Sequence, residues 1–178
     1  MLALLLILIV AMTALLLWRV TAAGKSALPR EGDAVPDFAL PDQHGVLRSS
    51  AEFRGRALIL YFYPRDDTPG CTEQAAQYRD AMREIDAAGA AVCGISVDDS
   101  ASHAEFARKY KLPYALLADR DGVIARRFGS LLDLRVIRFA RRNTFLIDAR
   151  GRIAKIYLGV NPAKNARDVL ADVRRLAQ

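Results

Sequence analysis

Two hydrophobic patterns alternate along the chain after residue 31. Continuous apolar runs are typical of strands buried on both faces of a sheet. Segments with apolar residues three and four apart are typical of helices with one buried face. This alternation predicts an α/β domain. The first predicted elements are a hairpin around 35–47, a short helix at 49–55 and a strand at 57–63. A helix at 72–88, a strand at 90–97, a helix capped by 98–100 and stopped at 112–113, and a strand at 114–118 follow. After a turn at 119–122 come a short helix at 123–128, strands at 144–148 and 153–158, and a last helix opened by 161–162.

The first part of the chain has a different pattern. Residues 2–18 carry no charge and are rich in Leu and Ile. As a helix this stretch would span roughly 26 Å, slightly less than the ~30 Å hydrocarbon core of a bilayer. We therefore expect a single-pass membrane anchor within residues 1–20, with a cleaved signal peptide as the alternative, because residues 20–22 fit a cleavage site. Cations follow the stretch, which favours a cytoplasmic domain over a periplasmic one.

Length and composition indicate one folded domain behind this segment. Residues 21–31 are interpreted as a linker, and residues 32–178 are enough for a single hydrophobic core. The charged fraction of 26% is ordinary for a globular protein. Two cysteines in a chain of this size do not make a disulfide framework.

The chemistry is concentrated in residues 61–74, which read YFYPRDDTPGCTEQ. Cys71 follows the first apolar strand and lies in the first turn of the next predicted helix. The unpaired N–H groups and the helix dipole at that end favour a thiolate over a thiol. Pro69 presets the backbone, Gly70 allows close approach of a ligand, and the Thr68 hydroxyl can donate to a thiolate or a bound oxygen. The pattern predicts a reactive cysteine.

The spacing of Pro64, Thr68 and Cys71 resembles the peroxidatic motif of the peroxiredoxins, and residues 61–72 resemble their peroxiredoxin Q branch, also called bacterioferritin comigratory proteins. The resemblance covers roughly residues 36–171. It implies a thioredoxin-like fold, with a mixed central sheet, helices on both faces and an N-terminal β-hairpin. It also implies a thiol-dependent peroxidase that uses no metal or other cofactor.

This resemblance assigns roles to four residues. Cys71 would attack hydrogen peroxide or an organic or lipid hydroperoxide and become a sulfenic acid. Pro64 and Thr68 belong to the same motif, and Arg142 is the second-site arginine that would stabilise the thiolate and the leaving oxygen. Arg141, one residue away on an extended backbone, should point in the other direction.

Regeneration of the thiol departs from the family pattern. Many relatives carry a resolving cysteine five residues after the first, where this chain has Ala76. The other cysteine, Cys93, lies inside an apolar strand and is interpreted as a core residue. We therefore expect a one-cysteine cycle in which thioredoxin, glutaredoxin or glutathione reduces Cys71. Whether the protein is a monomer or a homodimer stays open.

Two other functions remain as alternatives. A membrane-tethered, thioredoxin-like disulfide reductase would need a second cysteine near Cys71, and residues 72–74 provide none. A non-catalytic binding domain on the same fold gives no reason for the motif residues to occur together. Both histidines are expected at the surface, His44 in a turn and His103 in the first turn of a helix.

Residues 122–142 contain six arginines and one acid. One interpretation is a solvated insert whose arginine stems pack over apolar surface. The other is a surface that rests on anionic lipid headgroups, which would suit a domain tethered through residues 2–18 and acting on lipid hydroperoxides. Nucleic acid is not expected as a partner, because the arginines lack interleaved aromatics on a recognisable binding module.

Overall fold

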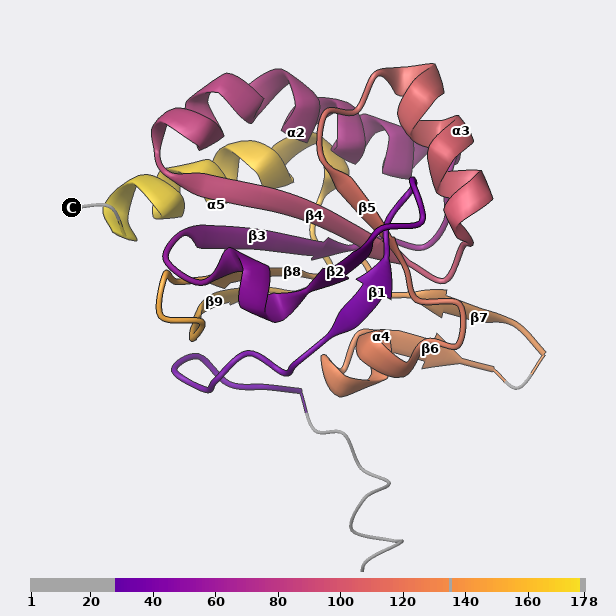
Figure 1. The fold of residues 1–178 in the computed structure, drawn as a ribbon, viewed down its shortest axis with the longest axis horizontal. Coiled ribbons are helices and arrows are strands. Elements are labelled where there is room, and N and C mark those ends of the chain that lie inside the picture. Colours follow the sequence, from indigo (N-terminus) through magenta and orange to yellow (C-terminus); the bar gives the residue numbers. More distant parts are fainter. Residues whose placement is uncertain (1–27, 135, 177–178) are drawn as a thin grey trace, which may run out of the picture.

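The computed structural model describes residues 28–134 and 136–176. Its centre is a 5-stranded mixed sheet in the order β5-β4-β3-β8-β9 (Figure 1). Strands β3, β4 and β5 are parallel, whereas β8 runs antiparallel to β3 and β9 runs antiparallel to β8. The strand bounds are Ala57–Phe62 for β3, Ala90–Ser96 for β4, Ala115–Ala118 for β5, Thr144–Ile147 for β8 and Ile153–Tyr157 for β9.

The expected membrane segment at residues 2–18 lies outside the described residues. Among the residues that are described, no helix has both the length and the apolar character needed to cross a membrane.

Three helices cover one face of the sheet. They are α2 (Pro69–Ala87), α3 (Ser100–Tyr110) and α5 (Pro162–Leu176), which lie together in the upper part of Figure 1. Ile59 and Tyr61 of β3 point toward this layer, where the ring of Tyr61 stacks on that of Tyr78 with centroids 4.9 Å apart. Burial of aromatic rings at this spacing is a large part of what holds a helix on a sheet.

The opposite face is covered by shorter elements. These are β1 (Ala39–Pro41), β2 (Leu47–Ser49), the 3₁₀ helix η1 (Ser50–Phe53) and α4 (Val123–Arg127). Residues of β3 with the other parity, such as Phe62, point into this second core, where Phe62, Phe128 and Phe145 form a cluster of rings. Both faces of the central strands are therefore buried, and the predicted α/β sandwich with an N-terminal hairpin is confirmed.

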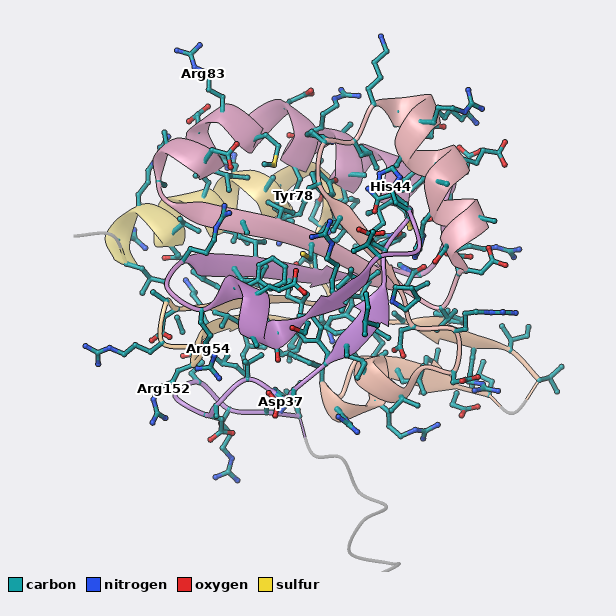
Figure 2. All side chains as sticks on the ribbon, viewed as in Figure 1. Asp37, His44, Arg54, Tyr78, Arg83 and Arg152 are labelled. Carbon is teal, nitrogen blue, oxygen red and sulfur yellow. The ribbon has the colours of Figure 1, made fainter. Side chains whose placement is uncertain are left out.

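Most predicted elements occur within a few residues of their expected bounds. Helix α2 begins three residues before the predicted start, because Thr68 is its N-cap and Pro69 occupies the first helical position, which tolerates a missing N–H. The turn that contains His44 joins β1 to β2, and His44 is exposed as expected (Figure 2).

One expectation is wrong, and one hairpin was not predicted. Between α4 and β8, β6 (Leu131–Asp133) pairs with β7 (Arg138–Ala140) in an antiparallel hairpin. Three-residue strands are too short to produce a readable alternation. His103 is not solvated: it is 0% exposed, because the first turn of α3 faces the loop before α2 rather than solvent.

Gly94 in the middle of β4 provides a test of the core around Tyr61. A Cβ at this position would lie 2.8 Å from the Tyr61 ring and 2.9 Å from Leu116. We expect Gly94→Ala to lower the free energy of unfolding by about 1–3 kcal/mol, because both neighbours are buried and cannot move away freely. Urea unfolding followed by circular dichroism measures the change. An unchanged midpoint would mean that these side chains adapt at no cost.

Candidate active site

Cys71 is the third residue of α2 and is 1% exposed. The first hydrogen bond of the helix runs from the N–H of Thr72 to the carbonyl of Thr68, at 2.9 Å. The N–H groups of Gly70 and Cys71 therefore precede the helical hydrogen-bond ladder. These donors, together with the helix dipole, favour negative charge at the sulfur.

Arg142 reaches this cysteine from the segment between β7 and β8. Its Nη2 donates to Cys71 Sγ at 3.3 Å, and its Nη1 donates to the carbonyl of Gly70 at 3.3 Å and to Gln74 Oε1 at 2.8 Å. A Cβ at Gly70 would lie only 3.3 Å from Nη2, so glycine leaves room for the guanidinium. Arg141 is exposed, as expected from the alternation of an extended backbone.

A buried hydrogen-bond network of two side-chain amides, Gln74 and Asn165, supports Arg142. Gln74 is 0% exposed, and its Nε2 donates to Asn165 Oδ1 at 2.9 Å. The same oxygen accepts from the hydroxyls of Tyr78, at 2.6 Å, and Thr144, at 2.9 Å. One acceptor therefore links α2, β8 and α5, and through Gln74 it fixes the direction of the guanidinium.

This network was not predicted from the sequence. Gln74 lies three residues after Cys71, so helical spacing alone places the two on neighbouring positions of one face. Asn165 offers no such signal, because it is 91 residues away from Gln74 in the chain.

Pro64 and Thr68 flank the loop between β3 and α2. Pro64 is half-buried and lines two cavities, one of about 380 Å³ shared with Ile137 and one of about 490 Å³ shared with Arg142. The Thr68 hydroxyl donates to the carbonyl of Arg65 at 3.1 Å. Its proton is thus engaged within the loop, and its oxygen can still accept a hydrogen bond.

Asp66 anchors the same loop in a buried polar cluster. Its carboxylate accepts from the hydroxyls of Tyr63 and Ser102, both at 2.7 Å, and lies 2.8 Å from His103 Nδ1. Burial, reinforced by the Asp66 carboxylate, raises the pKa of Tyr63 well above its usual value. Within the part of the chain that the structure describes, His103 Nε2 is a buried side-chain nitrogen with no hydrogen-bond partner.

The next residue ties the loop to the other end of α3. Asp67 has a φ of 55°, in the left-handed region, which aspartate tolerates better than most residues. Its carboxylate accepts from Lys109 Nζ, at 2.6 and 2.9 Å, and from the Tyr110 hydroxyl. These contacts also hold down the pKa of Asp67, through hydrogen bonds from Lys109 and Tyr110. Helix α3 thus holds the loop before Cys71 at two successive carboxylates.

Cys93 lies on the other side of the sheet. It sits in β4 opposite Leu60, and both belong to the core beneath β1, β2 and α4, whereas Cys71 belongs to the core beneath α2 and α5. Burial raises the pKa of the Cys93 thiol to about 12, so at neutral pH it stays protonated and unreactive. The interpretation of Cys93 as a core residue agrees with its 1% exposure.

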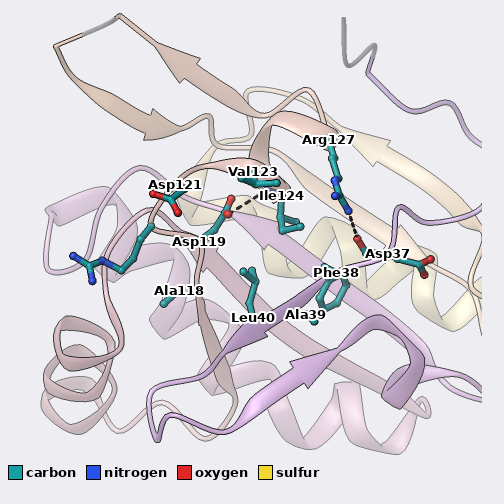
Figure 3. A pocket seen from close by; sticks show the side chains of 11 residues that line it. Asp37, Phe38, Ala39, Leu40, Ala118, Asp119, Asp121, Val123, Ile124 and Arg127 are labelled. Carbon is teal, nitrogen blue, oxygen red and sulfur yellow. Dashed lines mark hydrogen bonds between the residues drawn. The ribbon is translucent and has the colours of Figure 1, made fainter. Parts of the chain in front are cut away.

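A separate cavity of about 620 Å³ lies between β1 and α4, away from Cys71 (Figure 3). Its wall includes Asp119, whose carboxylate accepts from the N–H groups of Ile124 and Ala125 at 3.1 and 2.7 Å. Burial raises the pKa of Asp119. Asp119 therefore satisfies two N–H groups in the first turn of α4. Across the described ranges, no three His, Cys, Asp or Glu side chains are grouped so that they could hold a metal ion.

A thiol at a helix N-terminus over a mixed sheet of this topology defines the class, a thioredoxin-like protein with a thiol centre. Residues 31–156 match the model of the AhpC/TSA family. The chain belongs to this family, in the peroxiredoxin Q branch that the sequence motif indicated.

Three relatives illustrate the match. Peroxiredoxin Q, chloroplastic, from Oryza sativa subsp. japonica is 45% identical over 127 residues, which are 71% of this chain and 58% of the rice protein. This chain therefore spans less than two thirds of that relative. The structure of peroxidoxin BcpB from Mycobacterium tuberculosis is 34% identical, with a TM-score of 0.78, and the match covers 82% of this chain and 97% of that one.

The third relative is the bacterioferritin comigratory protein of Xanthomonas campestris, whose structure was analysed for its alkyl peroxide reduction activity. It is 29% identical, with a TM-score of 0.75, over 82% of this chain and 100% of that one.

The two adjacent carboxylates of the loop provide a matched test of the buried cluster. Asp66→Asn leaves too few acceptor sites for the hydroxyls and the imidazole that face it, and we expect the free energy of unfolding to fall by about 1–3 kcal/mol. Asp67→Asn keeps a residue that tolerates the left-handed backbone at a solvated site, so its effect should be clearly smaller. Urea titrations of both variants give the comparison. Equal losses would contradict the anchoring role of Asp66.

Proposed function

We propose that the protein is a thiol-dependent peroxidase that reduces hydrogen peroxide and organic hydroperoxides, lipid hydroperoxides included, at Cys71. The observation that carries this proposal is the contact of 3.3 Å between Arg142 Nη2 and Cys71 Sγ at the N-terminus of α2. A fixed cation and free N–H groups suit both a thiolate and the negative charge that grows on a departing oxygen. The alkyl peroxide reduction activity of the Xanthomonas campestris relative supports the same substrate class.

In the proposed reaction the Cys71 thiolate attacks the terminal oxygen of the hydroperoxide. The S–O bond forms as the O–O bond breaks, and the departing oxygen takes a proton to leave as water or an alcohol. The sulfur is oxidised to the sulfenic acid, and the peroxide is reduced by two electrons. Arg142 stabilises the charge on the departing oxygen. The Thr68 oxygen accepts the O–H of the peroxide, since its own proton is donated to Arg65.

Pro64 closes one side of the path to the sulfur. It lines a cavity of about 490 Å³ together with Arg142, and we propose that the hydroperoxide approaches Cys71 from this side. A rigid pyrrolidine ring at this position keeps water away from the reacting atoms without adding an N–H donor.

Regeneration is proposed to need an external thiol. Cys71 and Cys93 belong to cores on opposite faces of the sheet, and a disulfide requires Cα atoms within about 7 Å of each other. A first thiol would condense with the sulfenic acid and release water, and a second would release Cys71 and leave with the first as a disulfide. Thioredoxin, glutaredoxin or glutathione has the required chemistry.

The alternatives have weaker support. A disulfide reductase would need a second thiol beside Cys71, and the described contacts of the sulfur are with an arginine. A non-catalytic binding function gives no physical reason for the buried amide network that directs Arg142 at the sulfur. Tethering through residues 2–18, with the domain on the cytoplasmic or the periplasmic side, is part of the proposal and rests on the hydrophobic pattern of that stretch.

The adjacent arginines offer a matched pair of variants. We expect Arg142→Ala to lower kcat/KM for hydrogen peroxide by about 10²–10³-fold, as for the loss of a main electrostatic donor in other active sites. Arg141→Ala removes an exposed guanidinium from the next residue and should leave the rate within about twofold. The measurement is peroxide consumption with excess thiol. A comparable loss in both variants would point to general surface charge and contradict the assigned role of Arg142.

Intact mass spectrometry of the full chain tests the cycle itself. After one equivalent of hydrogen peroxide and no reductant, the mass should rise by one oxygen, and this gain should disappear in Cys71→Ser. Cys93→Ser should still gain the oxygen, because Cys93 takes no part. Loss of two hydrogens within a monomer would refute the one-cysteine cycle. Peroxide consumption by Cys71→Ser at the original rate would refute the proposed function.

A further inference from the structure

The turn of the β6–β7 hairpin is unusually apolar for its position. Leu134, Val136 and Ile137 are 58%, 92% and 60% exposed. The turn is closed by backbone bonds from Leu134 N to Ile137 O, at 3.0 Å, and from Val136 N to Leu134 O, at 2.8 Å. Hairpin turns normally carry Gly, Asn, Asp or other polar residues. Three large aliphatic side chains exposed to solvent close together in the sequence mark an interaction surface.

Cations lie near this tip and at the base of the hairpin. Arg138 is exposed and is held by a bond from its Nη1 to the carbonyl of Asp121 at 3.0 Å, and Arg65 and Arg141 are also exposed. Two of the nearby acids are engaged, since Asp133 pairs with Arg126 at 2.9 Å and Asp98 accepts from the hydroxyl of Ser96 at 2.6 Å, whereas Asp121 is exposed. Aliphatic side chains flanked by arginines complement a layer of anionic headgroups above hydrocarbon.

The hairpin also shares cavities with two residues assigned to the active site, Pro64 and Arg142. Ile137 and Phe139 share a cavity of about 380 Å³ with Pro64, and Phe139 lines the second cavity, of about 490 Å³, together with Arg142. A membrane that receives the tip would therefore lie next to the side from which the peroxide is proposed to approach.

The described chain begins on the same side of the molecule. Leu28 lines the cavity that Phe139 and Arg142 also line, and it packs against Gly129 just before β6. Figure 1 shows this start at the lower edge with α4 and the hairpin, away from α2. Nine residues separate Leu28 from Trp18, the end of the apolar stretch, and nine residues span at most about 32 Å. An anchor in residues 2–18 would keep this face near the bilayer.

We propose that the tip of the β6–β7 hairpin, through Leu134, Val136 and Ile137, inserts into the surface of an anionic lipid membrane. Leu134, Val136 and Ile137 enter the boundary between headgroups and acyl chains, while Arg138 and Arg141 contact lipid phosphates. The occupant is a membrane rather than a second copy of the chain, because a copy would bring the same arginines against each other. The surface orients the reactive side of the domain toward the bilayer.

The test locates the tip in the full chain. Trp18 is the only tryptophan of the sequence, so Trp18→Phe removes the native tryptophan fluorescence and a new tryptophan at position 137 can be observed alone. We expect Trp18→Phe/Ile137→Trp to lose at least about half its fluorescence in vesicles of brominated phosphatidylcholine with phosphatidylglycerol, because residues that insert at this boundary contact the brominated chains. The matched control is Trp18→Phe/Leu47→Trp, since Leu47 is 64% exposed on the other hairpin, β1–β2.

The charge requirement has its own comparison. Replacing phosphatidylglycerol by phosphatidylcholine should reduce the quenching at position 137, and Arg138→Ser should reduce it further than Arg83→Ser, which removes an exposed arginine from α2 (Figure 2).

Three outcomes would overturn the proposal. They are absence of quenching at position 137, equal quenching at positions 137 and 47, and a blue shift that depends on protein concentration without quenching, which would assign the tip to a second copy. The experiment measures where residue 137 lies relative to the bilayer and does not measure the rate of peroxide reduction. It can be repeated with Cys71→Ser, so its failure is distinct from failure of the proposed peroxidase function.

Discussion

The proposed chemistry depends on one contact between distant parts of the chain, the guanidinium of Arg142 against the sulfur of Cys71. The two residues are 71 positions apart, and only the sheet brings them together. Tyr61 at the end of β3 pairs with Thr144 at the start of β8, so the chain leaves β3 toward Cys71 at the same edge where Arg142 enters β8. A slip of one residue in this register would exchange Arg142 for Arg141 at the sulfur. The pairing of β3 with β8 therefore determines which arginine lies at the sulfur.

A second constraint acts on the loop between β3 and α2. A buried carboxylate is costly without hydrogen-bond donors, and Asp66 has the Tyr63 and Ser102 hydroxyls, both at 2.7 Å. The donors come from Tyr63, the residue after β3, and from Ser102 in α3. The loop therefore cannot move without disturbing contacts at both places, and α3 supports the loop that leads to Cys71.

Much of this arrangement could be predicted from the sequence, because it is encoded locally. The runs at 57–63 and 90–97 predicted the central strands, and the residues around Cys71 predicted a thiol at a helix start. The alternation of an extended backbone, with the family resemblance, separated Arg142 from Arg141. His103 was placed wrongly, because its burial depends on a loop 37 residues earlier. Asn165 and the β6–β7 hairpin were missed for related reasons. A lone amide carries no pattern, and three-residue strands are shorter than the roughly four to eight residues over which alternation can be recognised.

The sheet also separates the two cysteines, and this has a consequence for how the thiol is restored. Cys93 is in β4, which pairs with β3 on one side and β5 on the other, so bringing its sulfur to Cys71 would break both ladders and empty part of the second core. The raised pKa of the buried Cys93 thiol opposes the same step, since only a thiolate attacks a sulfenic acid effectively. In the proposed one-cysteine cycle, a thiol from another molecule has to reach a sulfur that is 1% exposed. The cavity that Pro64 and Arg142 line would then serve both the peroxide and the reductant in turn.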